Sequence, residues 1–220
     1  MLHTKATLVF LAVLLLFFSP LFIMTVSANW YSYYSQSGYY GLWATIYTPS
    51  SKPYTPNNDN QTHSVTTPGG GPWVQTGWML YPSWNQAKQY YEYGVGGVHD
   101  IVQLNDQTWG TGIKYEVSYD GSTGSNRWCV WINGAQIRCW NDVHTAPTLL
   151  TAQSETHATT DTVFFTEFKA IRIRNAAGTW VYPTLANHME ANPPYGNTIL
   201  TSESFLTWRH GIFLPLVKRY

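Results

Sequence analysis

Two short segments of the chain combine polar side chains with large aromatic rings. Residues 73–78 read Trp-Val-Gln-Thr-Gly-Trp, and residues 89–93 read Gln-Tyr-Tyr-Glu-Tyr. In a β-strand alternate side chains share a face, so Trp73 lies with Gln75, and Tyr90 lies with Glu92. A glutamine amide and a carboxylate on neighbouring strands, walled by aromatic rings, can hold a water and a polar substrate, or equally a sugar. Gln75 is therefore a candidate for chemistry, and Glu92, Trp73 and Tyr90 are candidates for substrate binding.

The elements that would position these residues are strands. Helical periodicity is almost absent, while short runs of β-branched and aromatic residues recur between turn signals. Roughly a dozen strands exceed what one open sheet usually holds, so we expect an all-β fold: an antiparallel jelly-roll β-sandwich of two packed sheets. A short helix is expected at residues 83–89. The expected strands are residues 40–47, 63–67, 73–81, 89–95, 99–105, 113–119, 127–132, 135–141, 149–155, 163–174, 180–182 and 202–209.

The N-terminus has the pattern of an export signal. His3 and Lys5 precede an apolar run over residues 7–24, and Val26-Ser27-Ala28 follows as a small-residue cleavage site. We expect residues 1–28 to be a signal peptide and residues 29–220 to form a single secreted β-sandwich domain. The alternative is an uncleaved membrane anchor, because the run approaches the roughly 20 residues that span a bilayer.

The charge of the chain argues against nucleic acid as a partner. Twelve basic and twelve acidic residues give a formal net charge of zero, and only 11% of residues are charged. A nucleic-acid-binding protein needs an excess of Lys and Arg, which this chain does not have. The seven histidines do not show metal-ligand spacing. We expect a monomer with no cofactor or metal and with no membrane contact after signal cleavage. Its expected partner is an extracellular polymer or a peptide substrate.

Asn133-Gly134 marks the clearest hairpin, since this pair readily adopts the positive φ values of a two-residue type I′ turn. Regular pairing from that turn places Trp131 and Trp140 together on the polar face of the hairpin. Aromatic rings on a polar face can stack on a sugar ring. Trp131 and Trp140 are therefore candidate substrate-binding residues.

Cys129 and Cys139, the only two cysteines, lie on either side of this turn. Regular pairing puts them on opposite faces, and only a bulge or an odd loop would bring their Cβ atoms close enough for a disulfide. The oxidising compartment nevertheless favours a disulfide between them, and two isolated cysteines do not make a structural zinc site.

The two opening segments resemble those of a known family. Gln75-Thr76-Gly77 and Tyr90-Tyr91-Glu92-Tyr93 are similar to the Gln-x-Gly and Trp-Tyr-Glu-Trp segments of the eqolisin glutamic peptidases. Residues 163–175 are similar to that family's late Phe-x-x-Phe strand and its Asn-Ala turn. Gly77-Trp78 and Pro82 also look like the more distant neprosin-type peptidases. The resemblance implies a concanavalin-like β-sandwich and a secreted, acid-active enzyme.

The resemblance also implies a mechanism. A glutamate acts as general base toward a water, and a glutamine amide donates to the developing oxyanion. Gln75 matches the glutamine. The family's Ala-Glu-Trp segment falls on residues 149–157, where the glutamate position lies at Thr151 or Gln153, or at Glu155 in a shifted alignment.

Two functions remain open from the sequence. The protein is a non-catalytic relative that binds carbohydrate or peptide through its polar and aromatic side chains, or an acid glutamic endopeptidase that uses Gln75 and Glu155 with support from Glu92. Glu155 is the candidate base because it is the sole carboxylate between Asp142 and Asp161.

Overall fold

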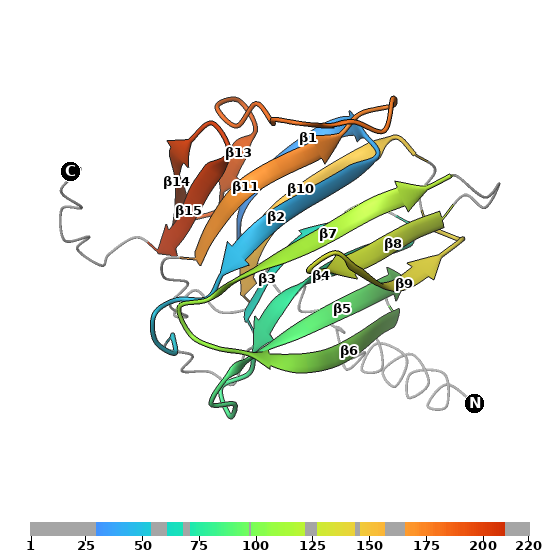
Figure 1. The fold of residues 1–220 in the computed structure, drawn as a ribbon. Coiled ribbons are helices and arrows are strands. Elements are labelled where there is room, and N and C mark those ends of the chain that lie inside the picture. The colour runs from blue at the N-terminus through green and yellow to red at the C-terminus, as the bar shows by residue number, and fades with distance from the viewer. Residues whose placement is uncertain are drawn as a thin grey trace, which may run out of the picture.

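The computed structural model describes residues 30–53, 61–67, 71–96, 98–121, 127–143, 146–156 and 166–209, and their regular structure consists of strands. The strands form two antiparallel sheets that pack face to face (Figure 1). The expected all-β sandwich of two packed sheets is thus confirmed. The expected signal peptide at residues 1–28 lies outside the described residues. Within them, no helix is long and apolar enough to cross a membrane.

The first sheet has seven strands. Its edges are the short β13 and the long β6, whereas β3 and β4 lie near its middle. Every pair of neighbours is antiparallel. In spatial order the strands are β13 (Met189–Ala191), β1 (Trp30–Tyr39), β10 (Thr148–Thr156), β3 (Gln61–Thr66), β4 (Trp73–Leu80), β5 (Ala87–Val95) and β6 (Val98–Gln107).

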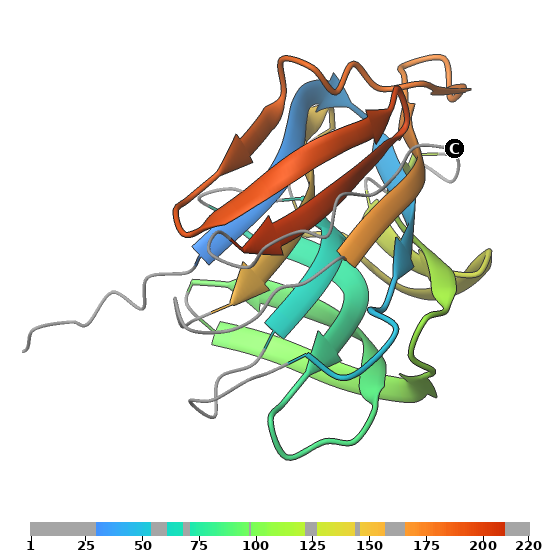
Figure 2. The same ribbon diagram turned by 90° about the vertical axis from the view of Figure 1, so that its left-hand side faces the viewer.

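The second sheet has eight strands and covers one face of the first. Figure 2 shows the two layers from the side of β14 and β15. In spatial order its strands are β14 (Tyr195–Thr201), β15 (Ser204–Arg209), β11 (Thr166–Arg174), β2 (Gly41–Tyr47), β7 (Gly112–Asp120), β8 (Arg127–Ile132) and β9 (Ala135–Trp140), and β12 (Trp180–Val181) pairs with β11.

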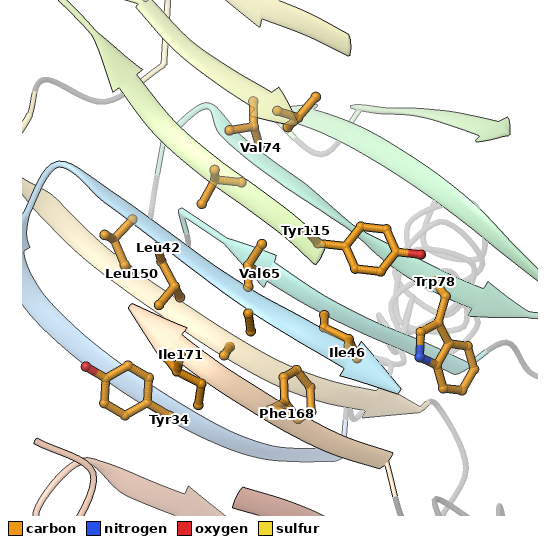
Figure 3. Close-up of a cluster of buried hydrophobic side chains, with 14 of the residues drawn as sticks. Tyr34, Leu42, Ile46, Val65, Val74, Trp78, Tyr115, Leu150, Phe168 and Ile171 are labelled. Atoms are coloured by element: carbon orange, nitrogen blue, oxygen red, sulfur yellow. The ribbon is translucent and has the colours of Figure 1, made fainter. Parts of the chain in front are cut away.

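Apolar side chains from both sheets fill the space between the layers. Strand alternation sends Val65, Val74 and Trp78 of the first sheet toward Leu42, Ile46 and Phe168 of the second (Figure 3). These six side chains are fully buried. The core therefore takes one face of each central strand, and the other face of the first sheet is left for polar residues.

Three strands were missed from the sequence, and one expected helix is absent. In β1, tyrosines occupy both faces, so the segment has no apolar alternation, and β13 and β14 are short or exposed. The helix expected at residues 83–89 was wrong. A turn in which the Trp84 N–H donates to the Tyr81 carbonyl leads directly into β5.

The hairpin of β8 and β9 has the expected turn but a different register. Asn133 and Gly134 have φ values of 50° and 80°, as a type I′ turn requires. Opposite Val130 and Trp131, a bulge leaves Ile137 of β9 as one extra residue and reverses the alternation beyond it. Cys129 consequently faces Cys139, and the two form the expected disulfide. The pairing is therefore not regular, and the bulge that a disulfide between these two cysteines requires is present.

The same bulge separates the two tryptophans. Trp140 is opposite Trp128 and belongs to the core, whereas Trp131 is opposite Gln136 on the outer face of the second sheet. The expected common face for Trp131 and Trp140 was therefore wrong.

Candidate functional site

The sheet register brings Gln75 and Glu92 together. Gln75 of β4 is the direct partner of Glu92 of β5, and directly opposed residues of an antiparallel pair project from the same face. Their neighbours Val74 and Tyr91 point into the core, so Gln75 and Glu92 lie on the opposite face of the first sheet. Both side chains are nonetheless buried, with 4% and 5% exposure.

We call this surface the polar face. It is the side of the first sheet that faces away from the second sheet, and the residues used below are Thr62, Ser64, Trp73, Gln75, Tyr90, Glu92, His99, Thr151, Gln153 and Glu155. These residues come from five adjacent strands, from β10 to β6.

A chain of hydrogen bonds runs across the polar face. The Gln75 side-chain amide donates to Glu92 Oε2 at 2.6 Å, and Glu92 Oε1 lies 2.7 Å from His99 Nδ1. On the other side, the Ser64 hydroxyl donates to Gln75 Oε1 at 3.4 Å. Both oxygens of the Glu92 carboxylate are thus occupied, which compensates for its burial. His99 remains half exposed and forms the outer end of the chain.

Trp73 forms a wall beside this chain. Gly94 is its register partner, and a Cβ atom at Gly94 would lie 2.3 Å from the Trp73 ring. The indole therefore lies directly over Gly94, where its ring also meets His99 edge-on at a centroid distance of 5.5 Å. This packing places an aromatic ring and a glycine next to the Glu92 carboxylate.

Glu155 lies farther along the same face. It is opposite Thr62 in the pairing of β10 with β3, and the Gln153 amide donates to Glu155 Oε2 at 3.4 Å. Burial raises the pKa of Glu155 to about 7, the negative charge of Glu92 adds to the rise, and His99 opposes it. Glu155 therefore keeps its proton in mildly acidic solution.

The negative charges of Glu92 and Glu155 both act on the Tyr90 phenol. Burial raises the pKa of this phenol well above the usual value, and the charges of Glu92 and Glu155 add to this effect. Ser64 and Thr62 are close enough to oppose part of the rise. No hydrogen bond of ordinary geometry joins the Tyr90 hydroxyl to another residue of the described ranges. Tyr90 remains a proton donor at any physiological pH.

The three alternatives for the glutamate position all lie on the polar face, because Thr151, Gln153 and Glu155 are two residues apart along β10. Through β3, Thr151 lies in the same cross-strand row as Gln75. Gln153 is one step along the strand from that row, and Glu155 is two steps. Glu155 is the only carboxyl group among the three, and it is the farthest from Gln75.

The structure brings five of the predicted site residues together and leaves two apart. Gln75, Glu92, Tyr90, Trp73 and Glu155 share the polar face. The other two, Trp131 and Trp140, belong to the second sheet. The Trp140 ring is stacked on Tyr93 at a centroid distance of 5.6 Å, so it packs in the core.

Sequence reasoning missed His99, although the hairpin of β5 and β6 contains the signal. Gly96 has a positive φ, which marks a turn between the two strands. That turn places His99 opposite Gly94, one step from Glu92. Among the described residues, no group of histidine, cysteine and carboxylate side chains is arranged to hold a metal ion.

The arrangement of the sheets is similar to that of glutamic peptidases of known structure. A structure of scytalido-glutamic peptidase with a peptide-based transition state analog superposes with a TM-score of 0.60 at 12% identity, over 82% of this chain and 97% of that chain. A structure of SCP-B, a member of the eqolisin family, in complex with the tripeptide Ala-Ile-His gives a TM-score of 0.55 at 11% identity, with the same coverage.

A second structure of scytalido-glutamic peptidase, with a transition state analog inhibitor, gives a TM-score of 0.54 at 13% identity. No model of a known protein family matches the chain, and a search of curated proteins gives no match. The chain thus has a distant glutamic-peptidase-like fold. Identities this low establish the fold alone.

Proposed function

We propose that the polar face binds extended peptides and that the protein is a non-catalytic, secreted relative of the glutamic peptidases. The hydrogen bond of 2.6 Å from the Gln75 amide to Glu92 is the observation that carries this proposal. An amide that stabilises an oxyanion must aim its N–H at the reacting carbonyl oxygen. Here one N–H of Gln75 is directed to a buried carboxylate instead, which suits a fixed binding surface.

The protonation state of Glu155 also supports a non-catalytic protein. A general base must be ionised to take a proton from water. Because the pKa of Glu155 is raised to about 7, this carboxyl group is protonated in the acidic range where the resembling peptidases work. Gln153, at the alternative position for the glutamate, cannot serve as a base at any pH. Neither residue provides a base for acid hydrolysis.

Peptide is the favoured ligand because of the groups that the polar face offers. The internal hydrogen bonds leave the second N–H of the Gln75 amide and the half-exposed His99 ring to bond a peptide backbone. Two of the similar structures contain a peptide-based analog and a tripeptide. Carbohydrate has less support, since Trp140 packs in the core and Trp131 lies on the other sheet.

Hydrolysis near neutral pH is a second candidate, favoured by the pKa of Glu155. A base with a pKa of about 7 is poised for proton transfer at neutral pH. In this mechanism Glu155 would accept a proton from water, and the second N–H of Gln75 would stabilise the oxyanion. Activity would then rise with pH through about 7, which is the opposite of an acid peptidase.

Binding can be tested by calorimetric titration of the protein with a panel of extended peptides and soluble polysaccharides. We expect peptide binding that is lost in Gln75→Ala and Glu155→Ala and retained in Gln136→Ala, a matched exchange on the exposed edge of the second sheet. Binding of polysaccharide alone, binding unchanged by both polar-face substitutions, or no binding at all would contradict the proposal.

Incubation with a denatured protein substrate at acidic and neutral pH separates the candidates. No cleavage at either pH is expected of the non-catalytic relative. Cleavage that increases through neutral pH and disappears in Glu155→Gln would establish the second candidate. Cleavage at pH 3 that requires Gln75 would instead show an acid peptidase and refute the argument from Glu155.

We also infer that the protein is exported and oxidised. The Cys129–Cys139 disulfide and the signal-like residues 1–28 support this inference. Expression with and without residues 1–28 tests it: we expect the protein in the medium only when the segment is present. Equal retention of both forms in the cell would refute export.

A further inference from the structure

Two buried hydroxyl groups of the polar face have no hydrogen-bond partner among the described residues. They are the Tyr90 phenol and Thr62 Oγ1, whose residues are 0% and 7% exposed. Leaving a buried hydroxyl unpaired typically costs about 1–3 kcal/mol, so native structures rarely retain two such groups near each other. The pair therefore points to a further hydrogen-bonding group at this position.

The surroundings of the two hydroxyls define what that group can be. Thr62 is directly opposite Glu155 in the sheet, and the charges of Glu155 and Glu92 both act on Tyr90. The neighbourhood also contains the Ser64 hydroxyl and the Gln153 amide. A small group that both donates and accepts hydrogen bonds fits these partners, and within the described ranges no set of histidine, cysteine and carboxylate side chains is arranged to hold a metal ion. Buried waters in proteins typically bridge polar partners in this way.

We propose that the hydroxyls of Tyr90 and Thr62 form a subsite for one ordered water beside Glu155. Tyr90 donates to this water, Thr62 completes its partners, and the water in turn hydrogen-bonds the Glu155 carboxyl group. Gln75 and Glu92 are not part of the subsite, since they are satisfied by each other, by Ser64 and by His99. Tyr90 is thus a positioning residue that acts on Glu155 through the water.

The subsite assigns a role to Tyr90, the first residue of the segment at residues 90–93. The Trp-Tyr-Glu-Trp segment that residues 90–93 resemble begins with an indole, whereas this chain has the phenol of Tyr90. Only the phenol brings an oxygen to this position. The inference does not require that the polar face binds peptide, because it concerns the ligand-free protein.

Thermal unfolding of Tyr90→Phe tests the subsite, with Tyr115→Phe as the matched control. Tyr115 is equally buried, and its hydroxyl donates to Gln107 Oε1 at 2.6 Å. If water satisfies Tyr90, removal of its hydroxyl lowers the Tm, as it does for Tyr115. If the hydroxyl is unpaired, Tyr90→Phe leaves the Tm unchanged or raises it, and the proposal is overturned. Thr62→Val should lower the Tm in the same way.

Two further measurements separate a water from a merely structural role. A high-resolution crystal structure should show a water within hydrogen-bond distance of both hydroxyl oxygens, and a dry site there would refute the proposal. NMR titration of the glutamate carboxyl carbons should show that Tyr90→Phe raises the pKa of Glu155, because the bridged donor is lost, while Tyr115→Phe leaves it in place. An unchanged Glu155 titration in Tyr90→Phe would exclude the positioning role. None of these readouts depends on peptide binding.

Discussion

Single residues determine how the stability of the protein depends on pH. Glu155 has a pKa of about 7 in the folded protein, whereas an unperturbed glutamate titrates near 4.5. The folded state therefore binds more protons than the unfolded state between these values. The stabilising effect of the bound proton is complete below about pH 4.5 and is lost as the pH rises through about 7.

Substitution of Glu155 should remove this loss. Between pH 5 and pH 8 the free energy of unfolding of the native chain should fall by about 2–3 kcal/mol more than that of Glu155→Gln. Urea unfolding at the two pH values measures this difference. Glu167→Gln, a matched exchange on the second sheet, is the control at the same two pH values. A pH-independent effect of Glu155→Gln would show that the carboxyl group is not perturbed.

His63 lies on the core side of the same sheet and changes stability with pH in the opposite direction to Glu155. Its ring is fully buried, stacked on Trp78 at 3.9 Å between centroids, and its Nδ1 lies 2.7 Å from the Ser154 hydroxyl. Burial lowers the pKa of His63 to about 3, so the folded protein keeps it neutral while the unfolded chain is protonated below about pH 6.5. Stability is therefore lost as the pH falls from about 6.5 toward 3.

A glutamine at position 63 should abolish that dependence. His63→Gln lowers stability at neutral pH, but its loss between pH 6.5 and 4 should be smaller than that of the native chain by about 3 kcal/mol. Chemical denaturation across this range measures the slope, with the partly exposed His188→Gln as control. Parallel slopes for the native and His63→Gln proteins would show that His63 is not responsible.

Among the elements, the contact of β3 with β4 sets the tightest steric limit. A Cβ atom at Gly77 would lie 1.9 Å from the His63 carbonyl oxygen, which belongs to the backbone of β3. We expect Gly77→Ala to lower the free energy of unfolding by about 3 kcal/mol or more, because a strand must move. Gly38→Ala is the control: it meets no atom within 4 Å, and its φ of 89° should cost only about 1–2 kcal/mol. Similar losses in equilibrium unfolding would contradict the steric argument.

The elements that the sequence predicts well are those with period-two alternation. In β4 and β5 alternate side chains, among them Val74 and Tyr91, point into the core, so the common face of Gln75 and Glu92 could be predicted without coordinates. β1 could not, because its tyrosines occupy both faces. The bulge in the hairpin of β8 and β9 also has no sequence signal, since Asn133-Gly134 specifies the turn and not the pairing beyond it.

For the whole molecule, Glu155 and His63 together determine how stability changes in acid, because their pH dependences have opposite signs. Between about pH 4.5 and 6.5 the proton on Glu155 and the neutral His63 ring change stability in opposite directions, and the effects largely offset each other. Below that range only the loss from His63 remains. His63 is also the first member of a buried polar chain that continues through Ser154 of the first sheet to Thr207 of the second. Charging this ring would therefore disturb the contact between the layers.

The alternation along β10 has an evolutionary consequence. Thr151, Gln153 and Glu155 project from one face of one strand, so a carboxylate could be exchanged among these positions without any change of backbone. Glutamine and glutamate have nearly the same shape, and their codons differ in a single nucleotide. A single nucleotide change at position 153 would therefore place a second carboxylate on this face of β10, with the same sandwich around it.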